Sequence, residues 1–168
     1  MTRAILVAVC IALVLLTLFG MRRGWRNRMA RQAFLPELPA VPGELGAELL
    51  RSSGLYVGTS FASSWQDRVV HSGLGIRAEA DAVLHPAGLV IERSGEAPVY
   101  LPAQSWRDAR LAPGLTGKVM GEGGLLVVRW QLGEALLDTA FRADDKTSYP
   151  NWVAAINEGI ARNEGVTA

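Results

Sequence analysis

The chain has 168 residues, of which 49% are hydrophobic and 20% are charged, with 17 Lys and Arg against 16 Asp and Glu. Residues 1–31 hold six arginines and no acid, so residues 32–168 carry a formal charge of −5. Nucleic-acid binding takes most of its affinity from neutralising phosphates, so an acidic domain without a basic stripe excludes nucleic acid as a partner. Cys10 is the only cysteine, which excludes an internal disulfide and a cysteine metal site.

Residues 4–21 form a run without any charged side chain, and eleven of these eighteen residues are Leu, Ile, Val or Phe. As an α-helix the run is about 27 Å long, close to the roughly 30 Å hydrocarbon core of a bilayer. It therefore predicts a single transmembrane helix. A cleaved signal peptide is the alternative, but its apolar region is shorter and ends in a small-residue cleavage site. Here Gly20 and Met21 lead directly into Arg22.

Positive charge predicts the orientation of this helix. Arg3 precedes the apolar run and five arginines follow it. The flank richer in Arg and Lys stays in the cytoplasm, so we expect a single-pass protein of the cell membrane with its N-terminus outside and its C-terminal domain in the cytoplasm. The side chains predicted to hold the helix in the lipid bilayer, called the basic collar below, are Arg22, Arg23, Trp25, Arg26, Arg28 and Arg31.

A Pro-rich segment follows the collar at residues 32–43. Pro36, Pro39 and Pro42 recur at three-residue spacing, which disfavours helix and favours an extended chain. Residues 35–43 would span roughly 28 Å as polyproline. The sequence thus predicts an anchor over residues 1–31, a linker over 32–43 and a globular domain over 44–168.

The globular part has the pattern of a mainly β domain. Short runs of alternating or β-rich residues are separated by turn signals every eight to twelve residues, which is typical of a sandwich or barrel. The glycine-rich residues 121–124 are expected to form a hairpin loop. The predicted strands cover residues 55–61, 76–84, 89–93, 99–101, 106–111, 118–120, 125–130 and 135–142.

The C-terminal residues change to a helical pattern. Thr147 and Ser148 are candidate capping residues, and Trp152, Ile156 and Ile160 recur at helical spacing. One amphipathic helix therefore follows about seven strands, and its tryptophan is suited to sealing one end of an open barrel.

This order of elements resembles the pleckstrin-homology-like (PH-like) barrel. With the N-terminal span, the chain is similar to the small membrane-anchored PH-like proteins of high-GC Gram-positive bacteria. The resemblance implies an open β-barrel of about seven strands capped by a C-terminal α-helix. It also implies a binding module that faces the cytosol, and it does not imply catalysis.

The first hairpin loop departs from the phosphoinositide-binding members of that family, which carry several Lys or Arg there. The matching residues 61–68 hold only Arg68, next to Asp67. Recognition of an inositol phosphate needs clustered cationic donors, so that function is not carried over. Trp65 stands among Ser63, Ser64 and Gln66, where a buried role is less obvious than for Trp106, Trp130 and Trp152. Trp65 and Arg68 are therefore the candidate binding loop.

No group of residues predicts catalysis, a cofactor or a metal. His71 and His85 are isolated in turns, and a nucleophile with its base needs an orienting third group. Glu79, Asp81 and Glu92 alternate along strands and mark a solvent face.

The most probable role from these patterns is non-enzymatic recognition of a membrane or cytosolic protein, or of a second copy of the chain. A lipid-headgroup or small-molecule binding module is one alternative, in which Trp65 contacts the bilayer. An accessory subunit of a membrane transport system is another, and it would require partners because a single span cannot form a pore.

Overall fold

The computed structural model describes residues 2–115, 118–119 and 124–166, and the side chains of 2–6, 8, 9, 25, 27–31, 118, 119 and 166 also lie outside this description. Most of the predicted loop at 121–124 is therefore outside it too. The chain divides into two compact units, Met1–Phe34 and Leu35–Ala168.

The first unit is one helix, α1, Thr2–Arg31. The 30 residues contain no proline, so the helix continues from the apolar run through the positions of the basic collar. Thr17, the one hydroxyl of the apolar run, donates from Oγ1 to the carbonyl oxygen of Val14 at 2.8 Å, so its polar group is satisfied within the helix. Across the described residues, no helix combines the length and the apolarity that crossing a membrane requires.

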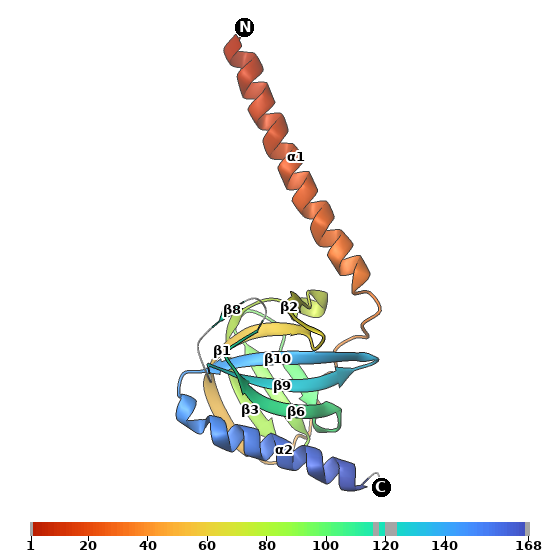
Figure 1. Cartoon of the computed structure of the whole chain (residues 1–168), viewed down its shortest axis with the longest axis vertical. Coiled ribbons are helices and arrows are strands. Elements are labelled where there is room, and N and C mark those ends of the chain that lie inside the picture. Colours follow the sequence, from red (N-terminus) through yellow and green to blue (C-terminus); the bar gives the residue numbers. More distant parts are fainter. Residues whose placement is uncertain (1, 116–117, 120–123, 167–168) are drawn as a thin grey trace. The chain divides into compact units, whose positions relative to one another are not determined.

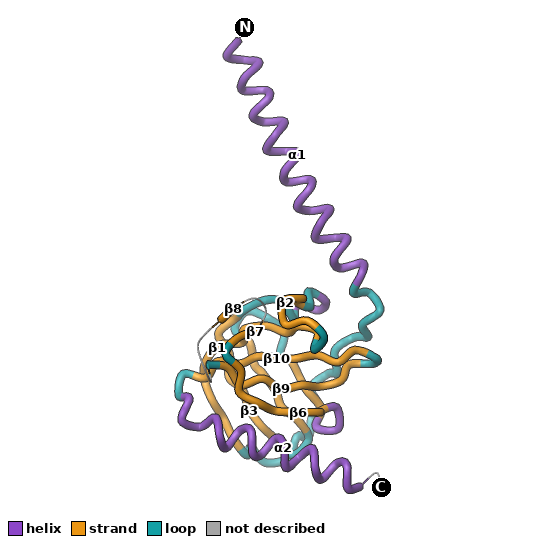
Figure 2. Tube along the Cα trace, viewed as in Figure 1, coloured by secondary structure: helices purple, strands orange, loops and turns teal. Residues whose placement is uncertain are grey.

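The second unit is an open antiparallel sheet with a helix at its end, which confirms the mainly β fold with a C-terminal helix (Figures 1 and 2). The eight-stranded sheet has the order β5-β4-β3-β1-β10-β9-β6, and β2 also pairs with β1. A two-stranded sheet joins β7 and β8. The strands are β1 (Leu50–Phe61), β2 (Ser64–Arg68), β3 (Ala78–His85), β4 (Gly88–Arg93), β5 (Val99–Pro102), β6 (Trp106–Ala112), β7 (Gly114–Leu115), β8 (Lys118–Val119), β9 (Leu125–Leu132) and β10 (Ala135–Ala143). The remaining elements are α2 (Tyr149–Val166) and the 3-10 turns His71–Gly73, Ala103–Ser105 and Lys146–Ser148.

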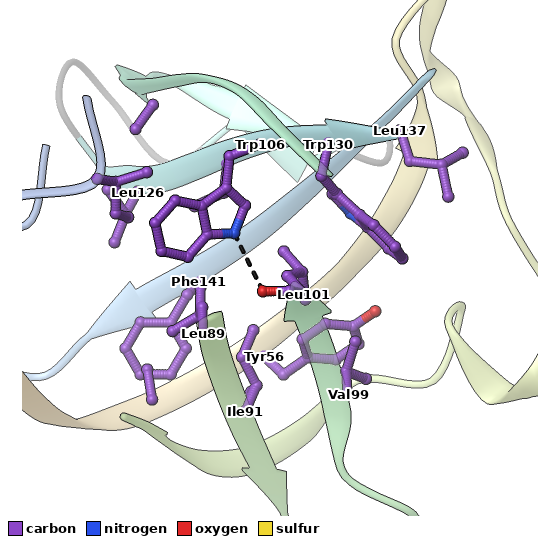
Figure 3. Close-up of a cluster of buried hydrophobic side chains, with 14 of the residues drawn as sticks. Tyr56, Leu89, Ile91, Val99, Leu101, Trp106, Leu126, Trp130, Leu137 and Phe141 are labelled. Atoms are coloured by element: carbon purple, nitrogen blue, oxygen red, sulfur yellow. Dashed lines mark hydrogen bonds between the residues drawn. The ribbon is translucent and has the colours of Figure 1, made fainter. Parts of the chain in front are cut away.

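Side chains alternate between the two sides of this sheet, as the strand geometry requires. The inward residues pack into one core, where Trp130 is 0% exposed and Trp106 4% exposed (Figure 3). From α2, Trp152 and Ile156 are buried against the same core, so the helix predicted to seal the barrel does so. Trp65 differs from these tryptophans because 45% of its surface is exposed.

A buried chain of hydrogen bonds runs through the core beside these aromatic rings. The Tyr56 hydroxyl donates to the carbonyl oxygen of Leu74 at 2.8 Å and lies 2.8 Å from Thr59 Oγ1. Thr59 Oγ1 in turn lies 2.7 Å from Thr139 Oγ1, which accepts from Trp130 Nε1 at 2.9 Å. Burial raises the pKa of Tyr56 to about 12, so its hydroxyl stays protonated and available as a donor.

Side chains cap the two edge strands where the sheet does not close by backbone pairing. At the β5 edge, Trp106 Nε1 donates to the carbonyl oxygen of Leu101 at 3.1 Å. At the β6 edge, Asn157 of α2 accepts from the Ala109 N–H at 3.1 Å and donates to the Ala109 carbonyl oxygen at 3.0 Å. Gly159 lets α2 approach closely, since a Cβ there would lie 2.9 Å from the Trp106 ring. These bonds occupy one backbone group of β5 and two of β6, which leaves fewer groups for an added strand.

The start of the predicted Pro-rich linker, at Leu35 and Pro36, lies against the barrel. Leu35 is 4% exposed and belongs to the core, and Pro36 lies beside Gly133 in the β9–β10 turn. Further along, the Leu49 N–H donates to the Leu84 carbonyl oxygen at 2.8 Å. Apolar burial of Leu35 favours this packing over the extended, solvated chain that the prolines alone suggest.

Candidate binding surfaces

The basic collar lies entirely on α1. Arg22, Arg23 and Arg26 are exposed, while the side chains of Trp25, Arg28 and Arg31 lie outside the described residues. Positions four apart on a helix share a face, so Arg22 and Arg26 project from one side. Exposed guanidinium groups in this arrangement suit contact with anionic groups.

Most of the first hairpin loop predicted over residues 61–68 is instead strand β2, and the structure separates the two predicted binding residues within it. Trp65 is exposed on β2. Arg68 turns back into the protein, where its Nη1 donates to the carbonyl oxygen of Gly75 at 2.7 Å. This guanidinium therefore positions the loop, and only Trp65 remains as an outward-facing group of the predicted pair.

A second arginine that sequence reasoning missed also holds this loop. Arg93 is 6% exposed, and its Nη1 and Nε donate to the carbonyl oxygens of Gly73 at 2.7 Å and Ala97 at 2.9 Å. Its guanidinium carbon lies 5.0 Å from the centre of the Tyr56 ring, a cation–π contact. The sequence contained a signal for this burial in β4. Leu89 and Ile91 point inward at alternate positions, and Arg93 is the next residue in that series. Both arginines near the first hairpin loop thus bind backbone carbonyls, which argues against a phosphate pocket there.

The outer side of β6, β9 and β10 carries a neutral cluster of charges, here called the paired face (Asp108, Arg110, Arg129 and Asp138). Asp138 accepts from Arg129 Nε at 2.8 Å and from Arg110 Nη2 at 2.6 Å, and Arg110 also binds Asp108 at 2.8 Å. Burial alone would raise the pKa of Asp138, but the hydrogen bonds from Arg129 and Arg110 outweigh it and hold the pKa below its usual range. Each carboxylate on this face therefore has a cationic partner.

An open groove of about 640 Å³ lies on the outer side of β4, β3 and β1. Ala80 and Ala82 point into the core, so Glu79 and Asp81 between them point outward into the groove. The floor is formed by backbone and small or apolar side chains, including Gly54 and Leu55. We call this feature the outer groove, lined by Ser53, Gly54, Leu55, Glu79, Ala80, Asp81, Glu92, Arg93, Ser94, Arg142 and Asp144.

The carboxylates of the outer groove are poorly neutralised. Asp81 lies opposite Glu92 in the β3–β4 register, which places two like charges directly across from each other. The nearest cation to Glu92 is Arg51 at 4.0 Å, in a pair whose side chains are 47% and 60% exposed. Within the described part of the chain, Glu79, Asp81 and Asp144 form no ion pair. The sequence placed Glu79, Asp81 and Glu92 on a solvent face but could not show that they share a groove.

The remaining candidate groups do not assemble into a reactive site. His85 Nδ1 lies 3.0 Å from the carbonyl oxygen of Gly46, and His71 lies in a 3-10 turn. Among the described residues, no group of three or more His, Cys, Asp or Glu is placed to hold a metal ion.

Comparison with known proteins gives a family-model match and likenesses to solved structures. Residues 35–157 match the model described as bacterial PH domain-like. The fold is also similar to a chain in the 8S snRNP assembly intermediate (TM-score 0.49, 10% identity, covering 74% of this chain and 89% of that one). A second likeness is to Vav1 inhibited by an allosteric inhibitor (TM-score 0.41, 12% identity, covering 84% of this chain and 34% of that one). No curated protein matches the sequence. At these TM-scores the two structures support no statement about function.

Proposed function

Because the chain belongs to the bacterial PH domain-like family, we propose that it presents this domain at the inner face of the cell membrane as a non-catalytic module that recognises another protein. The observation that carries the proposal is the outer groove, an open groove of about 640 Å³ whose lining includes four carboxylates and two arginines. The edge strands are partly capped and the arginines of the first hairpin loop bind carbonyls, so the groove is the surface best suited to a partner.

The membrane part of the proposal depends on the sequence. Residues 4–21 are uncharged and are followed by the five arginines of the basic collar. A flank this rich in arginine favours a cytoplasmic C-terminal side.

Topology is tested by reporters fused after Ala168 of the full chain. A fluorescent protein that matures only in the cytosol should be bright, and a phosphatase that is active only outside the cell should be silent. The reverse pattern would refute an inward-facing domain. Recovery of a mature protein that begins after residue 21 would refute the tether.

Recognition of a protein is tested in the same cells with a photo-crosslinking amino acid. We place it at Ser53, an exposed position in the outer groove, and in a matched strain at Glu158 on the exposed side of α2. A discrete protein adduct from position 53 and none from position 158 supports the proposal. Adducts of equal size and yield from both positions would contradict it.

Lipid binding by the barrel is a second candidate, favoured by the position of Trp65. The Ala62 N–H donates to the Leu136 carbonyl oxygen at 2.9 Å, so the β1–β2 turn lies next to the β9–β10 hairpin. Pro36, near the start of the unit, lies at the turn of that same hairpin. Exposed Trp65 therefore shares one end of the barrel with the residues that follow α1, and an indole is well suited to the interface of a membrane.

Hydrogen exchange of the full chain distinguishes this candidate from the first. If the barrel contacts lipid, amides of β2 will exchange more slowly in lipid nanodiscs than in detergent, and Trp65→Ser will remove the difference. Equal exchange in the two environments would leave recognition of a protein as the only supported role.

A further inference from the structure

The outer groove combines a charge pattern and a floor that specify the chemistry of its occupant. Glu79, Asp81 and Asp144 form no ion pair within the described residues, and Asp81 faces Glu92 across the strand pair. Like charges placed directly opposite each other destabilise a sheet. A cation bound between them would relieve that repulsion, whereas an anionic ligand would add to it.

The same part of the surface is shaped for long side chains with a charged end. At Gly54, which lines the groove, β1 and β10 approach so closely that an added Cβ would lie 2.2 Å from the Arg142 carbonyl oxygen. Leu55 adds apolar surface on which the methylene groups of Arg or Lys can lie while their charged ends reach carboxylates. Because the groove lies on the outer side of β4, β3 and β1, we place the occupant on the face of the sheet.

We propose that the outer groove binds an arginine- or lysine-rich segment that flanks a membrane span of a partner protein. The inference rests on the proposed function, because the cytoplasmic flanks of membrane proteins are enriched in Arg and Lys and a domain at the inner face would meet them there. Charge complementarity supports this partner over a lipid surface. Residues 32–168 carry a formal charge of −5, so the negative inner leaflet repels this domain while a basic flank is attracted to it.

Arg142 is a cation within the acidic groove, so it allows local binding to be distinguished from attraction by the net charge of the domain. It is half-buried in the groove, where it lies across from Leu55 in the β1–β10 register. A guanidinium in this place opposes a basic ligand at short range. Its removal should therefore strengthen binding, and the removal of neighbouring carboxylates should weaken it.

The experiment uses the full chain in nanodiscs of neutral lipid and a labelled peptide with the sequence of residues 22–31, RRGWRNRMAR, as a model basic flank. Fluorescence anisotropy at near-physiological ionic strength measures the dissociation constant. The groove variant carries Glu79→Gln, Asp81→Asn and Glu92→Gln. The control variant carries Glu134→Gln, Glu158→Gln and Glu164→Gln, which change the net charge equally at exposed positions outside the groove.

We expect the groove variant to bind the peptide at least about tenfold more weakly than the native chain, and the control variant to stay within about twofold. Arg142→Gln should bind about threefold more tightly, and a peptide with Gln in place of its five arginines should not bind. Circular dichroism of each variant verifies that the fold is retained.

Equal weakening of binding in the groove and control variants would overturn the inference, since bulk charge would then explain the affinity. An absence of peptide binding by the native chain would overturn it as well. Neither result affects crosslinking from Ser53 or the topology reporters. Failure of the basic-segment inference can therefore be distinguished from failure of the proposed function.

Discussion

The paired face and the outer groove lie on the same outer side of one sheet, but they differ in ion pairing. The carboxylates of the paired face have cationic partners, whereas most of those in the outer groove form no ion pair within the described residues. On the paired face, Asp138 binds two arginines and is nearly buried. In the outer groove, Asp81 faces Glu92 and has no ion pair within the described residues. Like charges placed opposite each other destabilise a sheet, so the contrast supports the proposal that the outer groove binds a basic partner.

The largest effect is expected from breaking the paired face at its centre. Asp138→Asn keeps the size of the side chain but leaves Arg110 and Arg129 without their shared counter-charge. We expect the free energy of unfolding to fall by about 2–4 kcal/mol. This lies in the lower part of the range for breaking a buried ion pair, because the side chains of both arginines are about one-third exposed. Urea unfolding at neutral pH measures it. If Asp138→Asn lowered the free energy of unfolding no more than Asp→Asn does at an exposed position, the paired face would stabilise the fold no more than the groove does.

The pH dependence of this loss sharpens the assignment. Because the pKa of Asp138 is lowered in the folded protein, its carboxylate stabilises the fold above the pKa of the unfolded chain, and that contribution is lost as pH falls through the folded pKa. The difference in unfolding free energy between the native chain and Asp138→Asn should therefore be largest near neutral pH. It should shrink once the pH drops below about 4. Urea titrations at several pH values test this, and a difference that stays constant down to low pH would show that lost packing, not charge, causes it.

Much of the barrel could be predicted from the sequence because its strands are short, alternate clearly and end at turn residues. Trp152 and Ile156 likewise predicted the sealing helix from their spacing. The packing of Leu35 could not be predicted, because three nearby prolines indicate extended chain equally well whether it is free or lies on a barrel. Local sequence reports backbone preference, and burial of Leu35 depends on a surface formed much later in the chain.

The binding surfaces were less predictable than the fold. Arg68 was a candidate because it stands in the first hairpin loop, but its direction toward the Gly75 carbonyl depends on how that loop folds back. Glu79, Asp81 and Glu92 were correctly placed on an outer face by their alternation. That Asp81 meets Glu92 depends on the register of β3 and β4, which turn geometry sets and the pattern of one strand does not.

Neutralising one groove carboxylate should have the opposite sign from neutralising Asp138. Asp81→Asn removes the repulsion with Glu92 and breaks no ion pair, so we expect the free energy of unfolding to rise by about 0.2–1 kcal/mol. The same urea experiment at neutral pH and low salt measures it. Added salt should shrink the gain because it screens the repulsion that the substitution removes. A loss of stability would mean that Asp81 holds the fold together and would remove the contrast between the two faces.

The smallest effect concerns Arg51, the cation that approaches the groove carboxylate Glu92. Its guanidinium bonds Glu48 at 2.8 Å and approaches Glu92 only to 4.0 Å, and 47% of its side chain is exposed. Ion pairs this exposed add little to stability, so Arg51→Gln should leave the free energy of unfolding unchanged within the error of a urea titration. A double-mutant cycle with Glu92→Gln isolates the link to the groove. If that cycle gave a coupling as large as the Asp138–Arg129 pair gives, Arg51 would already neutralise Glu92, and only the other groove carboxylates would remain for a basic partner.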